Sequence, residues 1–392
     1  MRYLPPVFSA IPLRVFAEAA AHAGSRRALP DAVARLEAEY PDRRCTLTSS
    51  GTAALELVLK ATKPEGGGLV ALPAYACPDL ATAAIGAGFR IVLYDLNCQT
   101  LAPELASVEH CLAAGATHIV VAHWYGQIID PAPVAALAKA SGAMVIEDAA
   151  QHAGGRLRGV RAGALSDWAI LSFGRGKGLN AGGGGAVLAG SAVADALLRL
   201  PQLPALSAMV SLRVLGGSVA TAVVAHPQVY GTIQGIPALA VGATRFTPPH
   251  PVSAMSPISA TLVRAALDAE PATLARRRCM DQEYLSAFAA IDDVESILEA
   301  PDTISGSLRH PFLVSDHVLP SMDSLHRLGV VRGYPKLLTD YPEIQPALVQ
   351  QHEEFPGANR LAKYLFTAPT HRFVRKTDIV HIAHYLRGLH AP

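Results

Sequence analysis

The sequence predicts an α/β fold, with a large domain built on a mostly parallel sheet and a smaller C-terminal α+β domain. From residue 43 onward, short apolar runs alternate with helical stretches, which is typical of a parallel sheet covered on both faces. The chain of 392 residues is long enough for two domains. A segment rich in proline, glycine and small residues, 203–251, follows the alternating region, so we expect domains at 1–250 and 251–392.

The elements can be assigned in order along the chain. Residues 12–38 carry two amphipathic helical stretches, which we expect to pack on a sheet or on a second subunit. The predicted strands are 69–72, 90–94, 118–121, 143–146 and 168–171, and the predicted helices between them are 53–61, 79–87, 103–114 and 131–140. Beyond residue 251 we expect a long helix at 259–289, strands at 310–314 and 330–334, and helices at 358–365 and 377–389. The basic run 276–278 is expected to be a solvated helix face.

Composition and charge argue against several classes of protein. The formal net charge of +1 gives no electrostatic basis for binding nucleic acid or an anionic membrane. Residues 205–225 are apolar, but Arg213 and two glycines interrupt them, so we expect a buried helix or an interface segment rather than a membrane span. Prolines break the N-terminal apolar stretch, which therefore lacks the core of a signal peptide. The five cysteines lack CxxC spacing, which disfavours a zinc site or disulfides and favours a reducing cytoplasm: Cys45, Cys77, Cys98, Cys111 and Cys279.

The stretch from Ser172 to Gly185 places one lysine, Lys177, in a glycine-rich loop after a predicted strand. Glycines allow positive φ and a close approach to a ligand, and α/β proteins bind ligands at the carboxyl edge of the sheet. An amine that is desolvated there has a lowered pKa and can act as a nucleophile. Taken alone, a lysine in such a loop is more often solvated, and the rest of the sequence favours the functional interpretation.

Two further segments point to the same edge of the sheet. Ser49-Ser50-Gly51-Thr52 follows a short strand and opens a helix, where backbone N–H groups and the helix dipole bind an anion; the same residues also suit an ordinary N-cap. The apolar strand at 143–146 runs into Glu147 and Asp148. A buried carboxylate at Asp148 needs a cationic partner, and a protonated pyridine nitrogen would be one.

Together these features match the needs of pyridoxal 5′-phosphate (PLP). This cofactor requires an anchored phosphate, an acid that keeps its ring nitrogen protonated, and a lysine that binds it covalently. Ser172 and Lys177 lie five residues apart after one strand and complete the set. The sequence therefore predicts a PLP protein.

Several short motifs follow one another between residues 40 and 190. They are Ser50-Gly51-Thr52-Ala53-Ala54, Pro73-Ala74-Tyr75, Trp124-Tyr125-Gly126-Gln127, Glu147-Asp148-Ala149-Ala150-Gln151 and Ser172-Phe173 ahead of Lys177, with a weaker match at Phe355-Pro356-Gly357-Ala358. In these motifs the sequence resembles the DegT/DnrJ/EryC1/StrS family, the sugar aminotransferases of PLP fold type I. The resemblance implies a large domain with a sheet of the seven-stranded type.

The resemblance also implies roles for individual residues. Lys177 would be the cofactor-binding lysine and proton shuttle, and Asp148 would pair with the pyridine nitrogen. Gln151 would lie beside the 3′ oxygen of the cofactor. The residues that would hold its phosphate are Gly51, Thr52 and Ser172.

Three positions depart from the family pattern. The family usually places an aromatic ring over the cofactor four residues after the proline that matches Pro73; this position is Cys77, and Tyr75 could substitute. The Gly-Glu-Gly-Gly that normally follows the lysine has become four glycines at 182–185. The Asn-Tyr-Arg-Met element that reaches the site of the neighbouring subunit has its nearest match at 252–256, Val-Ser-Ala-Met-Ser. These departures bear on the substrate more than on the cofactor.

Five other residues could line the pocket or meet an anionic group of the substrate. Each is at least as compatible with packing, solvent or dimer contacts: His123, Trp124, His152, Arg156 and Arg175.

The resemblance implies a cytoplasmic, homodimeric aminotransferase that transfers the amino group of an amino acid, glutamate, to a nucleotide-linked keto sugar. Because Lys177 is retained where the sugar dehydratases of the family carry histidine, transamination is favoured. Two alternatives stay open. One is a PLP enzyme of the same fold that acts on a non-sugar ketone or aldehyde, and the other is a PLP-binding regulator without turnover.

Overall fold

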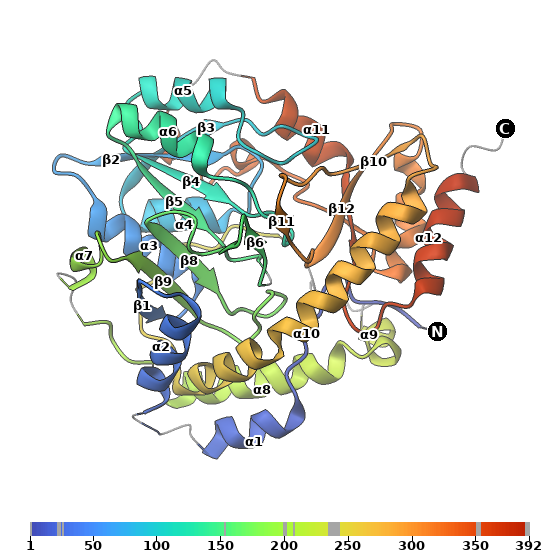
Figure 1. The fold of residues 1–392 in the computed structure, drawn as a ribbon, viewed down its shortest axis with the longest axis horizontal. Coiled ribbons are helices and arrows are strands. Elements are labelled where there is room, and N and C mark those ends of the chain that lie inside the picture. Colours follow the sequence, from blue (N-terminus) through green and yellow to red (C-terminus); the bar gives the residue numbers. More distant parts are fainter. Residues whose placement is uncertain are drawn as a thin grey trace.

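The structure is a computed structural model that describes residues 2–21, 25, 27–152, 154–198, 202–206, 208–233, 244–349 and 354–388. A seven-stranded sheet with the order β1-β9-β8-β5-β4-β2-β3 forms its larger part (Figure 1). These strands are β1 (Arg43–Thr48), β2 (Gly68–Pro73), β3 (Phe89–Tyr94), β4 (His118–Ala122), β5 (Met144–Asp148), β8 (Trp168–Ser172) and β9 (Gly185–Gly190). All pairs are parallel except those that β9 makes with β1 and β8. The predicted mostly parallel sheet is confirmed.

Helices cover both faces of this sheet. They are α3 (Gly51–Thr62), α4 (Asp79–Gly86), α5 (Leu105–Ala113) and α6 (Ala132–Ser141). The crossover from β2 to β3 runs outward, whereas the crossover from β3 to β4 returns past β2. Because such crossovers are right-handed, α4 lies on one face and α5 and α6 lie on the other.

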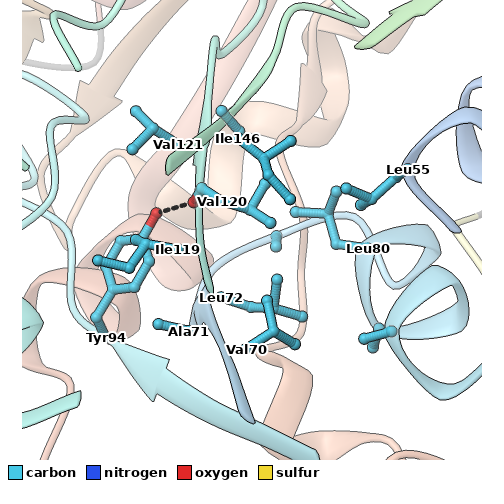
Figure 2. Packing of buried hydrophobic residues seen from close by; sticks show 14 of the residues in the cluster. Leu55, Val70, Ala71, Leu72, Leu80, Tyr94, Ile119, Val120, Val121 and Ile146 are labelled. Atoms are coloured by element: carbon cyan, nitrogen blue, oxygen red, sulfur yellow. Dashed lines mark hydrogen bonds between the residues drawn. The ribbon is translucent and has the colours of Figure 1, made fainter. Parts of the chain in front are cut away.

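The strands are apolar because both of their faces are buried. Figure 2 shows aliphatic side chains of β2 and β4 in one cluster with Leu80 of α4 and Ile146 of β5. The hydroxyl of Tyr94 donates a hydrogen bond of 2.6 Å to the carbonyl of Val120, which satisfies the polar end of a fully buried ring. This core fixes the strand ends from which the candidate site is built.

A second, antiparallel sheet has the order β10-β12-β14-β13. Its strands are β10 (Val294–Ser296), β12 (Arg309–Val314), β14 (Leu365–Pro369) and β13 (Val331–Arg332). The long helix α10 (Pro257–Phe288) runs diagonally across Figure 1 and packs with α1 (Leu13–Ala21), α2 (Ala28–Glu39) and α12 (Lys376–Gly388). Its first half joins the core beside β8 and β9, and its second half joins the core of the small sheet. The domain boundary at residue 250 stays a prediction.

Short elements complete the described chain. They are β6 (Arg156–Leu157), β7 (Val160–Arg161), β11 (Thr303–Ile304), α7 (Asp195–Leu198), α8 (Ala208–Val224), α9 (Pro227–Ile233), α11 (Pro356–Tyr364), and the 3-10 helices η2 (Leu319–Leu328), η3 (Leu338–Asp340) and η4 (Gln345–Ala347).

The predicted strands and helices of the large sheet agree with the structure within two residues at each end. The short strands β6, β7, β10 and β11 were not predicted, and neither were two longer strands: β9, because its glycine-rich start resembles a loop, and β14, because it begins at the last residue of the predicted helix 358–365. The expected strand at 330–334 is only two residues long, as β13. Residue 389, the expected end of the last helix, lies outside the described residues.

Residues 208–224 form a helix, α8. Of the two expectations for this segment, a buried helix is wrong for the chain by itself, and an interface segment stays a prediction. Met209 is 65% exposed, Leu212 59% and Val223 55%. Within the described part of the chain, no helix combines the length and apolar character needed to span a membrane.

Candidate active site

The candidate site residues gather at the carboxyl edge of the large sheet. Asp148 ends β5 and Ser172 ends β8, while Tyr75 and Cys77 follow β2. Since β2, β5 and β8 are parallel members of one sheet, these ends lie along the same edge. The start of α3 follows β1, which runs in the same direction as β8.

The first turn of α3 forms a cradle next to Ser172. The hydroxyl of Ser50 accepts a hydrogen bond of 3.0 Å from the backbone N–H of Ala53, so the N-cap interpretation is correct. Gly51 begins the helix, and a Cβ at this position would lie 2.8 Å from the Cβ of Ser172. The missing side chain therefore lets the hydroxyl of Ser172 approach the positive end of the helix, where anions bind.

The glycine run packs against this cradle. A Cβ on Gly185 would lie 2.3 Å from the carbonyl oxygen of Ser50, and the backbone N–H of Gly184 donates to the carbonyl of Ser49 over 3.1 Å. The backbone of Ser50 therefore excludes a side chain at Gly185. Ser253 lies beside them, since its carbonyl accepts from the N–H of Ser49 over 2.8 Å. The segment 252–256 thus contacts the cradle of its own chain.

Asp148 and Lys177 lie near each other at this edge of the sheet. The Asp148 carboxylate accepts a hydrogen bond of 2.9 Å from the backbone N–H of Ala150. Burial raises the pKa of this carboxyl, and the positive charge of Lys177 opposes the rise. Burial also raises the pKa of the Cys77 thiol to about 12, with Lys177 again opposing and the negative charge of Asp148 adding to the rise. The three side chains are therefore close enough to influence one another electrostatically.

Glu147 points to the other face of β5 and has a structural role. One of its carboxylate oxygens accepts hydrogen bonds from His123 Nε2 (2.8 Å) and the N–H of Gly163 (2.5 Å), and the other accepts from the N–H groups of Leu165 (2.8 Å) and Ser166 (3.2 Å). Because successive side chains of a strand alternate, only Asp148 of the two acids faces Lys177. His123 is held by Glu147 rather than by the site.

A group of aromatic residues borders the site beside Gln151. The Tyr75 hydroxyl lies 2.6 Å from that of Tyr125 and accepts a hydrogen bond of 2.9 Å from the N–H of Tyr334. Gln151 accepts a bond of 3.2 Å from the N–H of Tyr125 and donates one of 2.8 Å to the Tyr334 hydroxyl. These bonds fix the orientation of the Gln151 amide. Sequence reasoning missed Tyr334, because no motif surrounds it.

The backbone of the Trp124-Tyr125-Gly126-Gln127 motif is strained. Tyr125 has a φ of +57° and Gly126 has a φ of +94°. A Cβ on Gly126 would lie 2.4 Å from the backbone nitrogen of Leu308. The motif therefore depends on a glycine where the segment that leads into β12 passes closely.

The loop of Lys177 is held from behind by two residues that the sequence did not single out as site residues. Ser9 donates a hydrogen bond of 2.6 Å to the carbonyl of Lys177, and its own carbonyl accepts one of 2.9 Å from Asn180. Arg277 Nη2 donates to the Ser9 hydroxyl over 2.8 Å. Arg277 is 1% exposed, so the expectation of a solvated basic face is wrong at this position. Burial lowers its pKa to about 10, which leaves it protonated at neutral pH.

The other candidate residues have partners elsewhere. His152 accepts from the N–H of Gly154 over 2.9 Å and lies 3.3 Å from the Tyr40 hydroxyl. Arg156 is exposed and donates to the carbonyl of Gly159 over 3.0 Å. The remaining two pack against neighbouring elements: Trp124 against the ring of Tyr75, and Arg175 against Thr221 of α8.

The fold is that of PLP-dependent enzymes of fold type I. The candidate phosphate cradle, a buried acid and a lysine lie together at the carboxyl edge of its mostly parallel sheet. The model of the DegT/DnrJ/EryC1/StrS aminotransferase family matches residues 33–387, and the chain belongs to this family. The predicted family is therefore confirmed, and with it PLP as the cofactor.

Individual relatives share part of the sequence. The chain is 33% identical over 174 residues to the L-glutamine:2-deoxy-scyllo-inosose aminotransferase of Micromonospora echinospora, covering 42% of this chain and 41% of that protein. It is also 33% identical over 152 residues to the UDP-N-acetyl-3-dehydro-alpha-D-glucosamine 3-aminotransferase of Acidithiobacillus ferrooxidans, covering 38% and 41%. Each match spans less than half the length of the relative.

Similarity of fold covers more of the chain than similarity of sequence does. The putative sugar aminotransferase Spr1654 of Streptococcus pneumoniae, in its PLP form, superposes with a TM-score of 0.74 at 17% identity. The superposition covers 99% of this chain and 98% of that one.

PLP fits the residues that line the edge. Gly51 leaves open a space that a Cβ would fill, beside the hydroxyl of Ser172. The Ser49 hydroxyl at the same turn is buried without a hydrogen-bond partner among the described residues. Asp148, with its raised pKa, would be stabilised as a carboxylate by a pyridinium N–H.

Proposed function

We propose that the protein transfers an amino group from glutamate to a keto sugar that is linked to a nucleotide. The observation that supports this most directly is the shared environment of Lys177 and Asp148 at the carboxyl edge of the sheet. A lysine and an acid in this arrangement are what PLP-dependent transamination needs. Membership in an aminotransferase family supports the same reaction class.

The reacting groups have separate tasks. Bound PLP supplies an electron sink that stabilises negative charge on the carbon that loses its proton. The Lys177 amine would hold the cofactor and, as a free amine, would move the proton from the Cα of the donor during transfer. The Asp148 carboxylate would accept a hydrogen bond from the N–H of the pyridine ring. Since this carboxylate is desolvated, its interaction with the ring is stronger than in water.

Other residues position the cofactor. The phosphate would be held by the N–H groups of the first turn of α3 and the hydroxyls of Thr52 and Ser172, with Gly51 leaving the space. Gln151 would donate to the 3′ oxygen, its amide oriented by Tyr125 and Tyr334. Cys77 would lie against the ring.

Tyr75 would support the site from behind. Its hydroxyl is already bonded to Tyr125 and to the backbone of Tyr334, and its ring is fully buried. Between the two residues that could cover the cofactor, this geometry favours Cys77.

We further propose a homodimer in the reducing cytoplasm. The exposed apolar side chains of α8, Met209, Leu212 and Val223, lie on the helix that Arg175 of the lysine loop contacts. A second copy covering this face would therefore border the site. The cysteines are free thiols, which suits a reducing compartment. Leu212→Glu should convert the dimer to a monomer in light scattering, whereas an unchanged mass would contradict this interface.

The acceptor is tested by a panel of ketones. Purified protein with PLP and glutamate is incubated with UDP-, dTDP- and GDP-linked keto sugars, with a free keto-cyclitol and with simple ketones, and 2-oxoglutarate is measured. We expect product only with nucleotide-linked sugars, and none from Lys177→Ala. The strongest competing pair is a free keto-cyclitol with glutamine as donor, because the name of the Micromonospora echinospora relative contains this pair.

The same panel separates an enzyme from a regulator. If none of the acceptors in the panel leads to 2-oxoglutarate, although the protein binds PLP through Lys177, a PLP-binding regulator is favoured. Product from simple ketones alone would favour the non-sugar alternative.

A further inference from the structure

Two neighbouring cavities are lined by residues near the N-terminus, at the start of α9, in η2 and in and before α12. The N-terminus, α9 and α12 lie close together in Figure 1. The smaller has a volume of about 250 Å³ and the larger about 720 Å³. Arg2 is the residue that the two linings share. None of the residues that form the PLP cradle lines either cavity.

The lining of these cavities is strongly basic. The smaller is lined by Arg2, Arg372, Arg375 and His226, and the larger by Arg2, Arg327 and two histidines, without a carboxylate in either lining. The chain as a whole has almost balanced charge, with a formal net charge of +1, so the excess is local. Such a concentration of guanidinium groups around a small cavity suits a ligand with several negative charges.

One acid lies directly behind this lining. The buried carboxylate of Asp378 is 2.6 Å from Arg2 Nη1 and also accepts from the backbone N–H of Arg375 over 2.8 Å. It offsets the charge of Arg2. The positive charges of Arg372 and Arg375 remain in the smaller cavity, and that of Arg327 remains in the larger one. Together they match the roughly three negative charges of a nucleoside diphosphate at neutral pH.

Two arginines of the smaller cavity, Arg2 and Arg372, are held in place without a ligand. Asp378 and the carbonyl of Phe373 both accept hydrogen bonds from Arg2. The guanidinium of Arg372 lies over two aromatic rings, 5.4 Å from the centre of Phe8 and 4.9 Å from that of Phe373. Side chains that are already ordered lose less entropy when a ligand binds.

The larger cavity has a different character at its walls. Leu325, Leu328 and Tyr385 contribute apolar surface, and η2 and α12 supply these residues. Its volume is in the range of pockets that hold drug-sized ligands. A base and ribose would fit this wall, while the phosphates would reach the arginines beyond Arg2.

We propose that the two cavities form one binding site for a nucleoside diphosphate, separate from the PLP site. The diphosphate binds between Arg2, Arg372 and Arg375 in the smaller cavity, and the nucleoside lies against Tyr385 in the larger one. The assignment concerns binding only and does not depend on the proposed amino transfer.

The test is calorimetric titration of the PLP-loaded protein at physiological salt, with ADP, pyrophosphate and orthophosphate as probes. We expect one ADP per chain, bound at least tenfold more tightly than pyrophosphate, with orthophosphate weaker still. Arg375→Gln and Arg372→Gln should each weaken ADP at least tenfold. Tyr385→Ala should weaken ADP and leave pyrophosphate unchanged.

Arg360→Gln is the matched control, because Arg360 is an exposed arginine on α11 that lies outside both cavities and pairs with Glu295. It should bind ADP like the parent. Absence of saturable ADP binding, or ADP binding unchanged in Arg372→Gln/Arg375→Gln, would overturn the proposal. Pyrophosphate bound as tightly as ADP would overturn the nucleoside part. Because Arg375 is exposed, its variant should fold normally, which thermal unfolding of each variant checks.

Discussion

The two neighbouring acids at the end of β5 should respond to substitution in opposite ways. Asp148→Asn removes a carboxylate whose pKa is raised by burial. For the cofactor-free parent, a raised folded-state pKa means that stability is lost as pH rises past the ordinary aspartate pKa, and Asn should abolish this loss. The Asn variant should therefore be at least as stable as the parent at pH 7. Its loss of a charge-assisted hydrogen bond of about 2–3 kcal/mol to PLP should raise the Kd roughly 30- to 150-fold.

Glu147→Gln is the matched change on the opposite face. Each carboxylate oxygen of Glu147 faces two donors, so either orientation of a glutamine amide turns its NH2 group toward two N–H groups. Two charge-assisted bonds are lost, at about 1.5–3 kcal/mol each, giving about 3–6 kcal/mol. This loss is a large part of the roughly 5–15 kcal/mol that stabilises a typical domain.

Urea unfolding of the cofactor-free proteins, followed by circular dichroism, and PLP titration followed by absorbance measure both effects. The reasoning would be refuted by an Asp148→Asn protein that binds PLP as tightly as the parent. It would be refuted equally by a Glu147→Gln protein that unfolds at the same urea concentration as the parent.

Three further results are expected. Gly51→Ala should weaken PLP binding in the same titration at least tenfold, because the new Cβ would lie 2.8 Å from the Cβ of Ser172. Iodoacetamide at pH 8 should modify the exposed Cys279 well before Cys77, by mass spectrometry, because a thiol pKa of about 12 leaves roughly one thiolate in ten thousand. The free energy of unfolding should fall between pH 6.5 and pH 4 by up to roughly 3 kcal/mol from His371 alone, whose pKa burial lowers from 6.5 to about 4, because the unfolded chain takes up the proton first.

Matched variants decide these three results. Gly216→Ala lies in α8 with nothing within 4 Å of its new Cβ, and PLP loss equal to that of Gly51→Ala would contradict the cradle. Equal labelling rates for Cys77 and Cys279 would contradict the desolvated thiol. His371→Gln should show a smaller acid-induced loss of stability than the parent, and an identical loss would exclude the histidine as its source.

The large sheet could be predicted because its signals are local. Each buried parallel strand is a short apolar run, and the residues that follow it must lie at one edge, so the positions of Asp148 and Ser172 follow from the sequence. The alternation of side chains then separates Asp148 from Glu147. The start of α3 could also be predicted, because Ser50 followed by Gly51 is a recognisable helix N-cap.

The parts that could not be predicted depend on contacts between distant segments. Tyr334 reaches Gln151 from the segment that follows β13, and nothing in the sequence around it indicates this. The basic run around Arg277 looks like a solvated face, and only the packing of α10 buries that one residue. The role of the motif around Gly357 also depends on a distant residue. Asp95, after β3, accepts hydrogen bonds of 2.9 and 2.7 Å from the N–H groups of Gly357 and Ala358.

The bonds that Ser9 makes to Lys177 and Arg277 join three stretches that a ribosome produces at very different times. Arg277 emerges a hundred residues after Lys177, which takes roughly 5–20 s at bacterial or slower translation speeds of about 5–20 residues per second. Until then the loop of Lys177 lacks the hydrogen bond that Arg277 donates to Ser9. Capture of the vitamin B6 derivative should therefore be a late event in the biogenesis of this protein, after most of the polypeptide has been made.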